Sequence, residues 1–199
     1  MQPEIYWIKD FKAGHLAIMP KPRAGDWLED EIKGLSLNGV NILVSLLTAD
    51  EVYELDLKEE HKICQSHDIQ FLSFPITDRD VPSSVAETTQ LSQFLLTQII
   101  RGKKVAIHCR AGIGRSALMV ASILVCSGIK PQRAYEIIAK SRGLKVPDTE
   151  VQKQWLYDRS PNFSFSVPRE ILDSYLNGVQ DSSWTPIKEN TQQYRVEFL

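Results

Sequence analysis

With 199 residues, the chain has the length of one domain, with room for a tail. Hydrophobic residues make up 43% and charged residues 24%, which predicts a soluble protein with a sizeable core. The net charge of −2 gives no reason to expect nucleic acid or an anionic membrane surface as a partner.

The cysteines and the apolar stretches indicate a compartment. Cys64, Cys109 and Cys126 are widely spaced and no pair has metal-ligand spacing, so we expect reduced thiols, no metal site and a cytoplasmic location. Residues 1–5 lack the basic and apolar regions of a secretory signal. The longest apolar stretch, 116–129, is too short and too broken by Ser and Gly to span a bilayer.

Strands and helices are predicted to alternate along the first half of the chain. Residues 16–19 form a strand ended by prolines, residues 26–38 an amphipathic helix, and residues 41–47 an apolar strand of the type buried on both faces. Thr48 and Glu51 have capping-box spacing and open a helix, and a charged helical stretch continues to about residue 67. Residues 69–76 return to strand and end in the polar loop 77–82.

The second half continues the alternation. Ser84 and Glu87 have the spacing of a second capping box before an amphipathic helix. A strand over 103–107 and helices over 116–129, 131–140 and 148–157 follow. This order predicts an α/β fold with a mostly parallel central sheet of about four or five strands flanked by helices. Ligands of such sheets bind beyond the carboxyl ends of the strands, so the loops 77–82 and 108–116 can share one rim.

The composition changes near residue 160, after which Ser, Pro, Asn and Gln become frequent. We therefore predict a catalytic domain over residues 1–159 and a C-terminal extension over residues 160–199. The sequence leaves open whether this extension packs against the domain, and it carries no indication of the oligomeric state.

The segment His-Cys-Arg-Ala-Gly-Ile-Gly-Arg-Ser, residues 108–116, carries the chemistry. It places Cys109 at the end of an apolar strand and Arg115 at the start of an apolar helix. A helix N-terminus and an arginine stabilise a thiolate, the nucleophilic form of cysteine. Gly112 and Gly114 permit the positive φ angles and close approach that an anion-binding curl of backbone N–H groups requires. The expected phosphate-binding residues are Arg110, Ala111, Gly112, Ile113, Gly114 and Arg115.

His-Cys-x5-Arg-Ser is the signature of the cysteine-dependent protein tyrosine phosphatase superfamily, and this segment resembles its compact dual-specificity branch. Residues 74–82, Phe-Pro-Ile-Thr-Asp-Arg-Asp-Val-Pro, are similar to the general-acid loop of that branch, including the kinase-associated phosphatases. The likeness covers roughly residues 16–157 and implies the protein tyrosine phosphatase fold.

By this resemblance, Cys109 would be the nucleophile that forms a phosphocysteine intermediate, and Arg115 would bind the phosphate and stabilise the charge of the transferring group. Ser116 would donate a hydrogen bond to the sulfur as it leaves. Asp78 would protonate the leaving oxygen and then activate the hydrolytic water, although Asp80 lies in the same loop and is its rival. No metal or cofactor is required, because the arginine and the loop amides supply the electrophilic stabilisation.

Several neighbouring residues have a supporting role or an open one. His108 points to the opposite face of its strand from the cysteine, and we expect it to orient the loop through buried hydrogen bonds. Arg110 either contacts substrate or lies on the rim. Cys64 is either a core residue or the partner of a protective disulfide. By the resemblance, Gln152 or Gln154 is a candidate for positioning the hydrolytic water.

Together these features predict a protein phosphatase that hydrolyses phosphotyrosine, with a phosphoprotein as its partner. The sequence leaves open whether it also hydrolyses phosphoserine and phosphothreonine. The first alternative is the same chemistry on a non-protein ester, a phosphoinositide or an RNA 5′ phosphate, which the absence of loop lysines disfavours. The second is a phosphate-binding module without turnover. Binding alone needs neither a thiol nor an acid, which disfavours this module.

Overall fold

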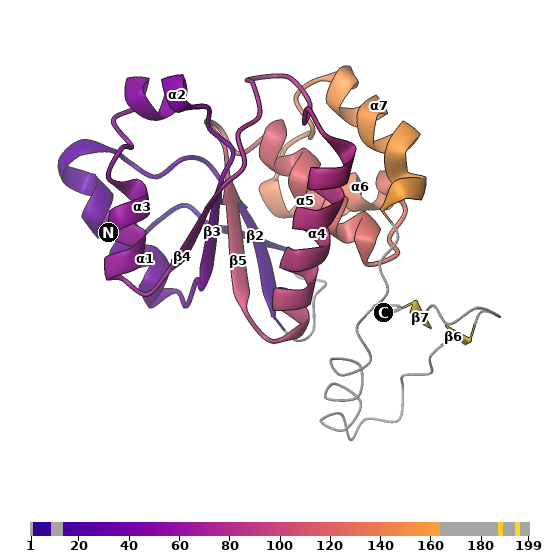
Figure 1. Cartoon of the computed structure of the whole chain (residues 1–199), viewed down its shortest axis with the longest axis horizontal. Helices are drawn as coiled ribbons and strands as arrows, with labels where there is room; N and C mark the ends of the chain where they lie inside the picture. The colour runs from indigo at the N-terminus through magenta and orange to yellow at the C-terminus, as the bar shows by residue number, and fades with distance from the viewer. Residues whose placement is uncertain (1, 9–13, 164–186, 189–193, 196–199) are drawn as a thin grey trace.

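A five-stranded sheet forms the centre of the computed structural model, which describes residues 2–8, 14–163, 187–188 and 194–195 (Figure 1). The strands lie in the order β1-β2-β5-β3-β4. Their bounds are β1 (Tyr6–Ile8), β2 (His15–Met19), β3 (Ile42–Ser45), β4 (Gln70–Ser73) and β5 (Lys104–His108). Strands β2 to β5 are parallel and β1 pairs antiparallel with β2. The predicted α/β fold with a mostly parallel sheet is confirmed, and β1 is an addition that the sequence analysis did not predict.

Helices cover both faces of the sheet (Figure 1). One face carries α1 (Leu28–Leu37) and α3 (Glu60–Ser66), and the other carries α4 (Val85–Ile100), α5 (Arg115–Cys126), α6 (Pro131–Arg142) and α7 (Glu150–Arg159). The short helix α2 (Ala49–Glu54) follows β3, and 3-10 turns lie at η1 (Gly25–Trp27) and η2 (Ser160–Asn162). Two further strands, β6 (Ile187–Lys188) and β7 (Tyr194–Arg195), form a separate antiparallel pair. Most of the predicted extension over 160–199 lies outside the described residues, so its boundary at residue 159 stays a prediction.

Alternating strand side chains divide the core into two clusters. Val105 and Ile107 of β5 pack with the α4–α7 side, whereas Ala106 packs with the α1–α3 side. Because successive strand residues point to opposite faces, a strand covered on both sides is apolar throughout. Continuing this alternation past β5, Cys109 belongs to the α4–α7 cluster, and His108 faces α3.

Helix α5 lies inside the larger cluster, and all twelve of its residues are buried. It packs against α4, α6, α7 and β2, so its first turn is fixed relative to the carboxyl edge of the sheet. None of the helices in the described part of the chain combines the length and the apolar composition that crossing a bilayer requires.

Candidate active site

The loop between β5 and α5 curls at the carboxyl edge of the sheet. Its two glycines occupy positions that disfavour a larger residue, each for a different reason. Gly112 has φ +67°, and a Cβ there would lie 2.6 Å from the carbonyl carbon and oxygen of Met19. Gly114 has φ −88°, so the positive φ expected at this residue is not found. Instead, a Cβ at Gly114 would lie 2.8 Å from Oε1 of Gln152, so a larger residue at this position would displace the Gln152 side chain.

The thiol lies at the floor of this curl. Cys109 is 3% exposed, and its Sγ is 3.2 Å from Oγ of the buried Ser116. This is the contact that the resemblance implies for a hydroxyl that stabilises the leaving sulfur. The amino end of α5 begins at Arg115, so the thiol faces the positive end of a buried helix dipole.

Arg115 is almost completely buried and contacts two carboxylates. Its Nη1 and Nη2 donate to Glu51 at 2.6 and 2.8 Å, and Nη2 lies 2.8 Å from Oδ1 of Asp78. Nη1 also donates to the carbonyl oxygen of Ile76 at 2.8 Å. Burial lowers the pKa of Arg115, but the hydrogen bond to Glu51 and the nearby negative charges outweigh burial and raise it. The guanidinium is therefore charged and held in one orientation.

Glu51 is a site residue that the sequence analysis assigned only to a helix start. The capping box is confirmed: Oγ1 of Thr48 accepts from the N–H of Glu51, and Oε2 of Glu51 accepts from the N–H of Thr48. The same carboxylate binds Arg115 with both oxygens. Burial raises the pKa of Glu51, but the hydrogen bonds from Arg115 and Thr48 outweigh burial and lower it.

The second predicted capping box, at Ser84, is only half formed. Its Oγ accepts a hydrogen bond from the N–H of Glu87, but the Glu87 side chain does not bond back to the N–H of Ser84.

The two aspartates of the acid loop point to different partners. The Asp78 carboxylate contacts Arg115, although 56% of its side chain is exposed. The Asp80 carboxylate instead accepts a hydrogen bond from the N–H of Val81 at 2.8 Å. The structure therefore brings Asp78, and not Asp80, to the phosphate loop.

The acid loop is tied to α7 through a capping box that the sequence analysis did not predict. Gln152 and Thr149 form this box, and Nε2 of Gln152 donates to the carbonyl oxygen of Asp80 at 3.1 Å. Gln152 is fully buried and packs against Gly114. Gln154 is bonded to Asp158 at the surface, so Gln152 is the one of the two candidate glutamines that faces the loop.

Arg110 lies on the rim of the loop. Its Nη2 is 2.8 Å from Glu54, its Nε is 3.7 Å from Glu51, and 41% of its side chain is exposed. The rim charge is thus matched by carboxylates of α2.

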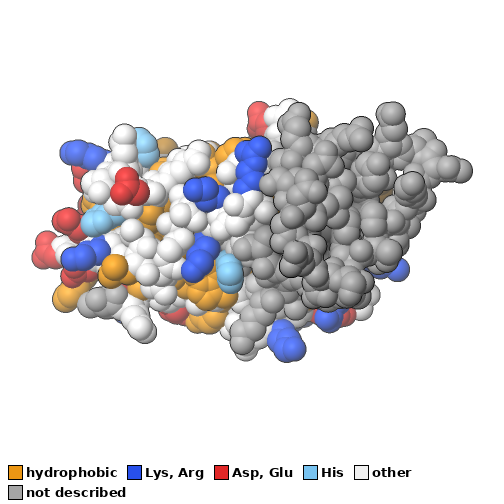
Figure 2. Space-filling view, turned by 90° about the horizontal axis from the view of Figure 1, so that it is seen from below, with side chains coloured by type: hydrophobic (Ala, Val, Ile, Leu, Met, Phe, Trp, Pro, Cys, Tyr) orange, Lys and Arg blue, Asp and Glu red, His pale blue; other side chains and the backbone are white. Residues whose placement is uncertain are grey.

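Figure 2 shows the edge of the sheet opposite this loop. In the coloured part of that view, basic, acidic and hydrophobic side chains are interspersed.

His108 and Cys64 lie on the α1–α3 side of the sheet. His108 is fully buried, but neither ring nitrogen has a well-aligned hydrogen-bond partner among the described residues, so the expected hydrogen bonds are not found. The buried Glu60 lies beside it, with Oε1 3.1 Å from Nε2. Burial, together with the charge of Glu60, raises the pKa of the Cys64 thiol to about 12. Cys64 belongs to the α1–α3 cluster and Cys109 to the α4–α7 cluster, which favours a core role for Cys64.

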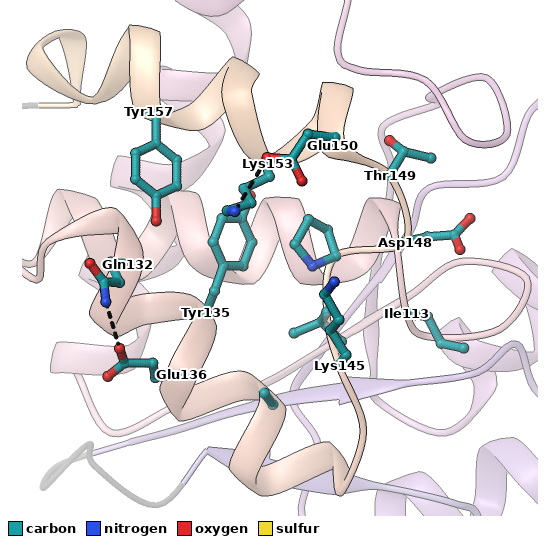
Figure 3. A pocket seen from close by; sticks show the side chains of 13 residues that line it. Ile113, Gln132, Tyr135, Glu136, Lys145, Asp148, Thr149, Glu150, Lys153 and Tyr157 are labelled. Carbon is teal, nitrogen blue, oxygen red and sulfur yellow. Dashed lines mark hydrogen bonds and ion pairs between the residues drawn. The ribbon is translucent and has the colours of Figure 1, made fainter.

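A pocket of about 550 Å³ opens beside the phosphate loop, between α6 and α7 (Figure 3). Ile113 and Asp148 line its loop side, and Tyr135, Lys145 and Lys153 are among the other lining residues. The pocket adjoins the curl through Ile113, so it offers room for groups that flank a bound phosphate. Among the described residues, no three His, Cys, Asp or Glu side chains are grouped so that they could hold a metal ion.

Comparisons with known proteins agree with this geometry. Residues 41–160 match the model of the dual specificity phosphatase catalytic domain. Cyclin-dependent kinase inhibitor 3 of Rattus norvegicus is 29% identical over 106 residues, which cover 52% of this chain and 47% of that protein. The chain spans about a third to a half of the length of the curated relatives it matches.

Two solved structures have a similar fold. The kinase associated phosphatase, with its catalytic cysteine replaced by serine, superimposes with a TM-score of 0.74 at 20% identity, over 82% of this chain and 97% of that chain. PTPMT1 in complex with PI(5)P superimposes with a TM-score of 0.63 at 23% identity, over 79% and 96%. At these identities the structures show the fold alone, and the family rests on the match over residues 41–160. The chain belongs to the dual specificity phosphatase catalytic domain family.

Proposed function

We propose that the protein is a metal-independent cysteine phosphatase that hydrolyses phosphotyrosine and also phosphoserine or phosphothreonine in phosphoproteins. The observation that carries the proposal is that the thiol of Cys109, the guanidinium of Arg115 and the carboxylate of Asp78 surround one anion-binding curl. Binding a phosphate requires only the curl and the arginine, whereas a nucleophile and an acid are needed to cleave its ester.

In the first step, the sulfur of Cys109 attacks phosphorus. The S–P bond forms as the P–O bond to the substrate breaks, and Asp78 gives its proton to the departing oxygen. Arg115 uses its Nη1–Nη2 edge for Glu51, which leaves the Nε–Nη2 edge, where Asp78 now lies, for two phosphate oxygens. An entering phosphate thus takes over the guanidinium edge and frees the Asp78 carboxyl for the leaving group.

In the second step, water attacks the phosphocysteine. Asp78 accepts a proton from this water, the S–P bond breaks, and Ser116 stabilises the sulfur anion through the contact at 3.2 Å. Gln152 packs against the loop and bonds the backbone of the acid loop, so its amide is the one suited to orient the water. The two-step route replaces one difficult hydrolysis by two easier transfers.

A protein substrate is favoured over a phosphoinositide or an RNA 5′ phosphate by the charge of the loop. Arg110 is its one basic side chain besides Arg115, and Arg110 is matched by Glu54. A multiply charged headgroup would call for further unmatched cations. The reaction requires a reduced thiol, which a reducing compartment such as the cytoplasm maintains, so the cytoplasm is the proposed location.

The proposal is tested by trapping the intermediate. We expect acid-quenched turnover of an aryl phosphate to leave one phosphoryl group on the peptide that contains Cys109, and Cys109→Ser to abolish turnover. Phosphotyrosine peptides, phosphothreonine peptides and vesicles with a phosphoinositide then rank the substrates. Full turnover by Cys109→Ser would refute the mechanism, and vesicles outperforming both peptides would refute the protein substrate.

A further inference from the structure

The outer side of the phosphate loop is bonded by residues far from it in the sequence. In a trans peptide unit the C=O and the N–H point in opposite directions. N–H groups that face an anion therefore send the preceding carbonyls outward, where they need donors. Three consecutive carbonyls have such donors: Arg110 O accepts from the N–H of Lys21 at 3.3 Å, Ala111 O from Nη2 of Arg142 at 3.2 Å, and Gly112 O from Nε of Arg142 at 2.9 Å.

Arg142 is fixed by contacts of its own. It is the last residue of α6, it is 8% exposed, and its guanidinium lies 3.9 Å from the centre of the Tyr6 ring. Nη1 lies 3.8 Å from the Glu4 carboxylate, and that carboxylate accepts a hydrogen bond from the Tyr6 hydroxyl. Tyr6 belongs to the edge strand β1. The N-terminal segment therefore holds the group that bonds the phosphate loop.

We propose that Arg142 is a positioning residue of the phosphate site and that β1 and β2, with Glu4 and Lys21, belong to the catalytic unit. By bonding the carbonyls of Ala111 and Gly112 from outside, Arg142 turns the N–H groups of Gly112 and Ile113 inward, toward the anion. Arg142 contacts the back of the loop and not the reacting atoms. The role deepens the proposed function, because it concerns the same oxyanion site.

The support from the N-terminal segment lies outside the region that matches the family. That match begins at residue 41, whereas Tyr6, Met19 and Lys21 all contact the loop or its arginine. The Met19 carbonyl blocks any side chain at Gly112. The N–H of Lys21 donates to the carbonyl oxygen of Arg110. Met19 and Lys21 thus contact the outer side of the curl directly, and Tyr6 contacts it through Arg142.

The chemistry of this position requires a guanidinium. A lysine ammonium keeps the charge, but it cannot match two successive carbonyls with a planar fork or stack flat on the Tyr6 ring. Arg142→Lys therefore separates charge from geometry. Arg133 on the same helix is a matched control, because 65% of its side chain is exposed and it pairs only with Glu136 among the described residues.

The test measures oxyanion binding in the full chain without requiring turnover. Iodoacetate modification of Cys109 is followed by mass spectrometry with increasing orthovanadate, and thermal melting shows that each variant is folded. Burial raises the pKa of Cys64 and Cys126 to about 12, so these thiols stay unreactive near neutral pH. Aryl phosphate kinetics give kcat and KM for the same variants.

We expect orthovanadate to protect Cys109 about 10–100-fold more weakly in Arg142→Met, because a small displacement of binding groups has effects of this size. Arg142→Lys should lose about 10-fold and Tyr6→Leu several-fold, whereas Arg133→Met should stay within about two-fold of the wild type. In turnover the loss should appear in both kcat and KM, because the same amides bind ground state and transition state.

The outcomes separate this role from the proposed function. Unchanged protection in folded Arg142→Met overturns the positioning role. If that variant does not fold, unchanged protection in both Arg142→Lys and Tyr6→Leu overturns it, as does a wild-type protein that orthovanadate does not protect. Weakened protection in a protein that cleaves no phosphoester would uphold the role of Arg142 and refute the phosphatase activity instead.

Discussion

The phosphate loop and the acid loop face each other across the site, but they are built differently. Cys109, Arg115 and Ser116 are all buried, and the loop around them is held by glycine contacts and by outer hydrogen bonds. Residues 77–80 of the acid loop are exposed. A few contacts tie this loop to the rest of the fold: Arg115 bonds the carbonyl of Ile76 and pairs with Asp78, and Gln152 bonds the carbonyl of Asp80.

This difference matches the two tasks. Stabilising a transferring phosphoryl group requires donors that are already in place, because reorienting them during the reaction would cost energy. An acid must meet the leaving group but also let substrate enter and product leave, which favours an exposed segment. Changes in the phosphate loop should therefore affect every substrate, and changes in the acid loop only those whose leaving group needs a proton.

The largest effect should come from Arg115→Lys. The lysine keeps the charge but loses the fork that binds Glu51 on one edge and phosphate on the other, so kcat/KM should fall about 10³-fold. Steady-state kinetics on an aryl phosphate and on a phosphopeptide check this, with Arg133→Lys as the control. A loss of kcat/KM on only one of the two substrates would contradict the view that Arg115 acts with the phosphate loop on every substrate.

The second largest effect is expected from Asp78→Ala in the acid loop. Asp78→Ala should lower kcat about 10²-fold on a phosphopeptide, the lower end of what a positioned acid contributes, because its carboxyl is exposed. The loss should be much smaller on an aryl phosphate whose phenol leaves without help, and the limb of the pH–rate profile that belongs to the acid should disappear. Asp80→Ala is the matched control, since its carboxylate bonds the N–H of Val81. The larger loss in Asp80→Ala would transfer the role to that residue.

The same comparison explains what the sequence could predict. The phosphate loop could be recognised because its thiol, glycines and arginine are contiguous and stand between two strongly apolar segments. Glu51, Gln152 and Arg142 come from three other helices, and no local pattern relates them to the loop. The capping-box spacing of Thr48 and Glu51 was visible, but it specified only where a helix begins.

The orientation of side chains also could not be predicted from the sequence. Asp78 and Asp80 could not be separated by sequence, because the direction of each carboxylate depends on the turn in which the N–H of Asp80 bonds the carbonyl of Thr77 and on the distant Arg115. Strand β1 has three residues, too few to show an alternating pattern. It is specified by pairing with β2 rather than by its own periodicity.

Glu51→Gln tests the ion pair between Glu51 and Arg115, which fixes the arginine of the phosphate loop. The amide cannot match both Nη groups, so we expect kcat/KM to fall about 10-fold and the unfolding free energy to fall by about 1–3 kcal/mol, between the values of exposed and buried pairs. Because the pKa of Glu51 is lowered in the folded state, its contribution is present above the ordinary carboxyl pKa of ~4.3 and is lost as the pH falls through the folded value.

Denaturant unfolding of Glu51→Gln and the wild type at several pH values checks this sign. The difference in free energy should be largest near neutral pH and should shrink under acid conditions. A difference that grows as the pH falls would show that the folded state does not favour the ionised carboxylate. Glu54→Gln is the control, because Glu54 is exposed and, within the described part of the chain, pairs only with Arg110 on the rim.

The smallest effect concerns the thiol on the other side of the sheet. Cys64 is fully buried in the α1–α3 cluster, so Cys64→Ala should cost about 1 kcal/mol of stability through lost packing and leave kcat unchanged. After oxidation by peroxide, the variant and the wild type should recover activity at the same rate when a thiol is added. If a disulfide between Cys64 and Cys109 is found by mass spectrometry in the oxidised wild type, and Cys64→Ala becomes irreversibly inactivated, the two sides of the sheet are coupled. In that case the phosphate loop must open far enough to bring its buried sulfur to α3, and it is less rigid than its hydrogen bonds indicate.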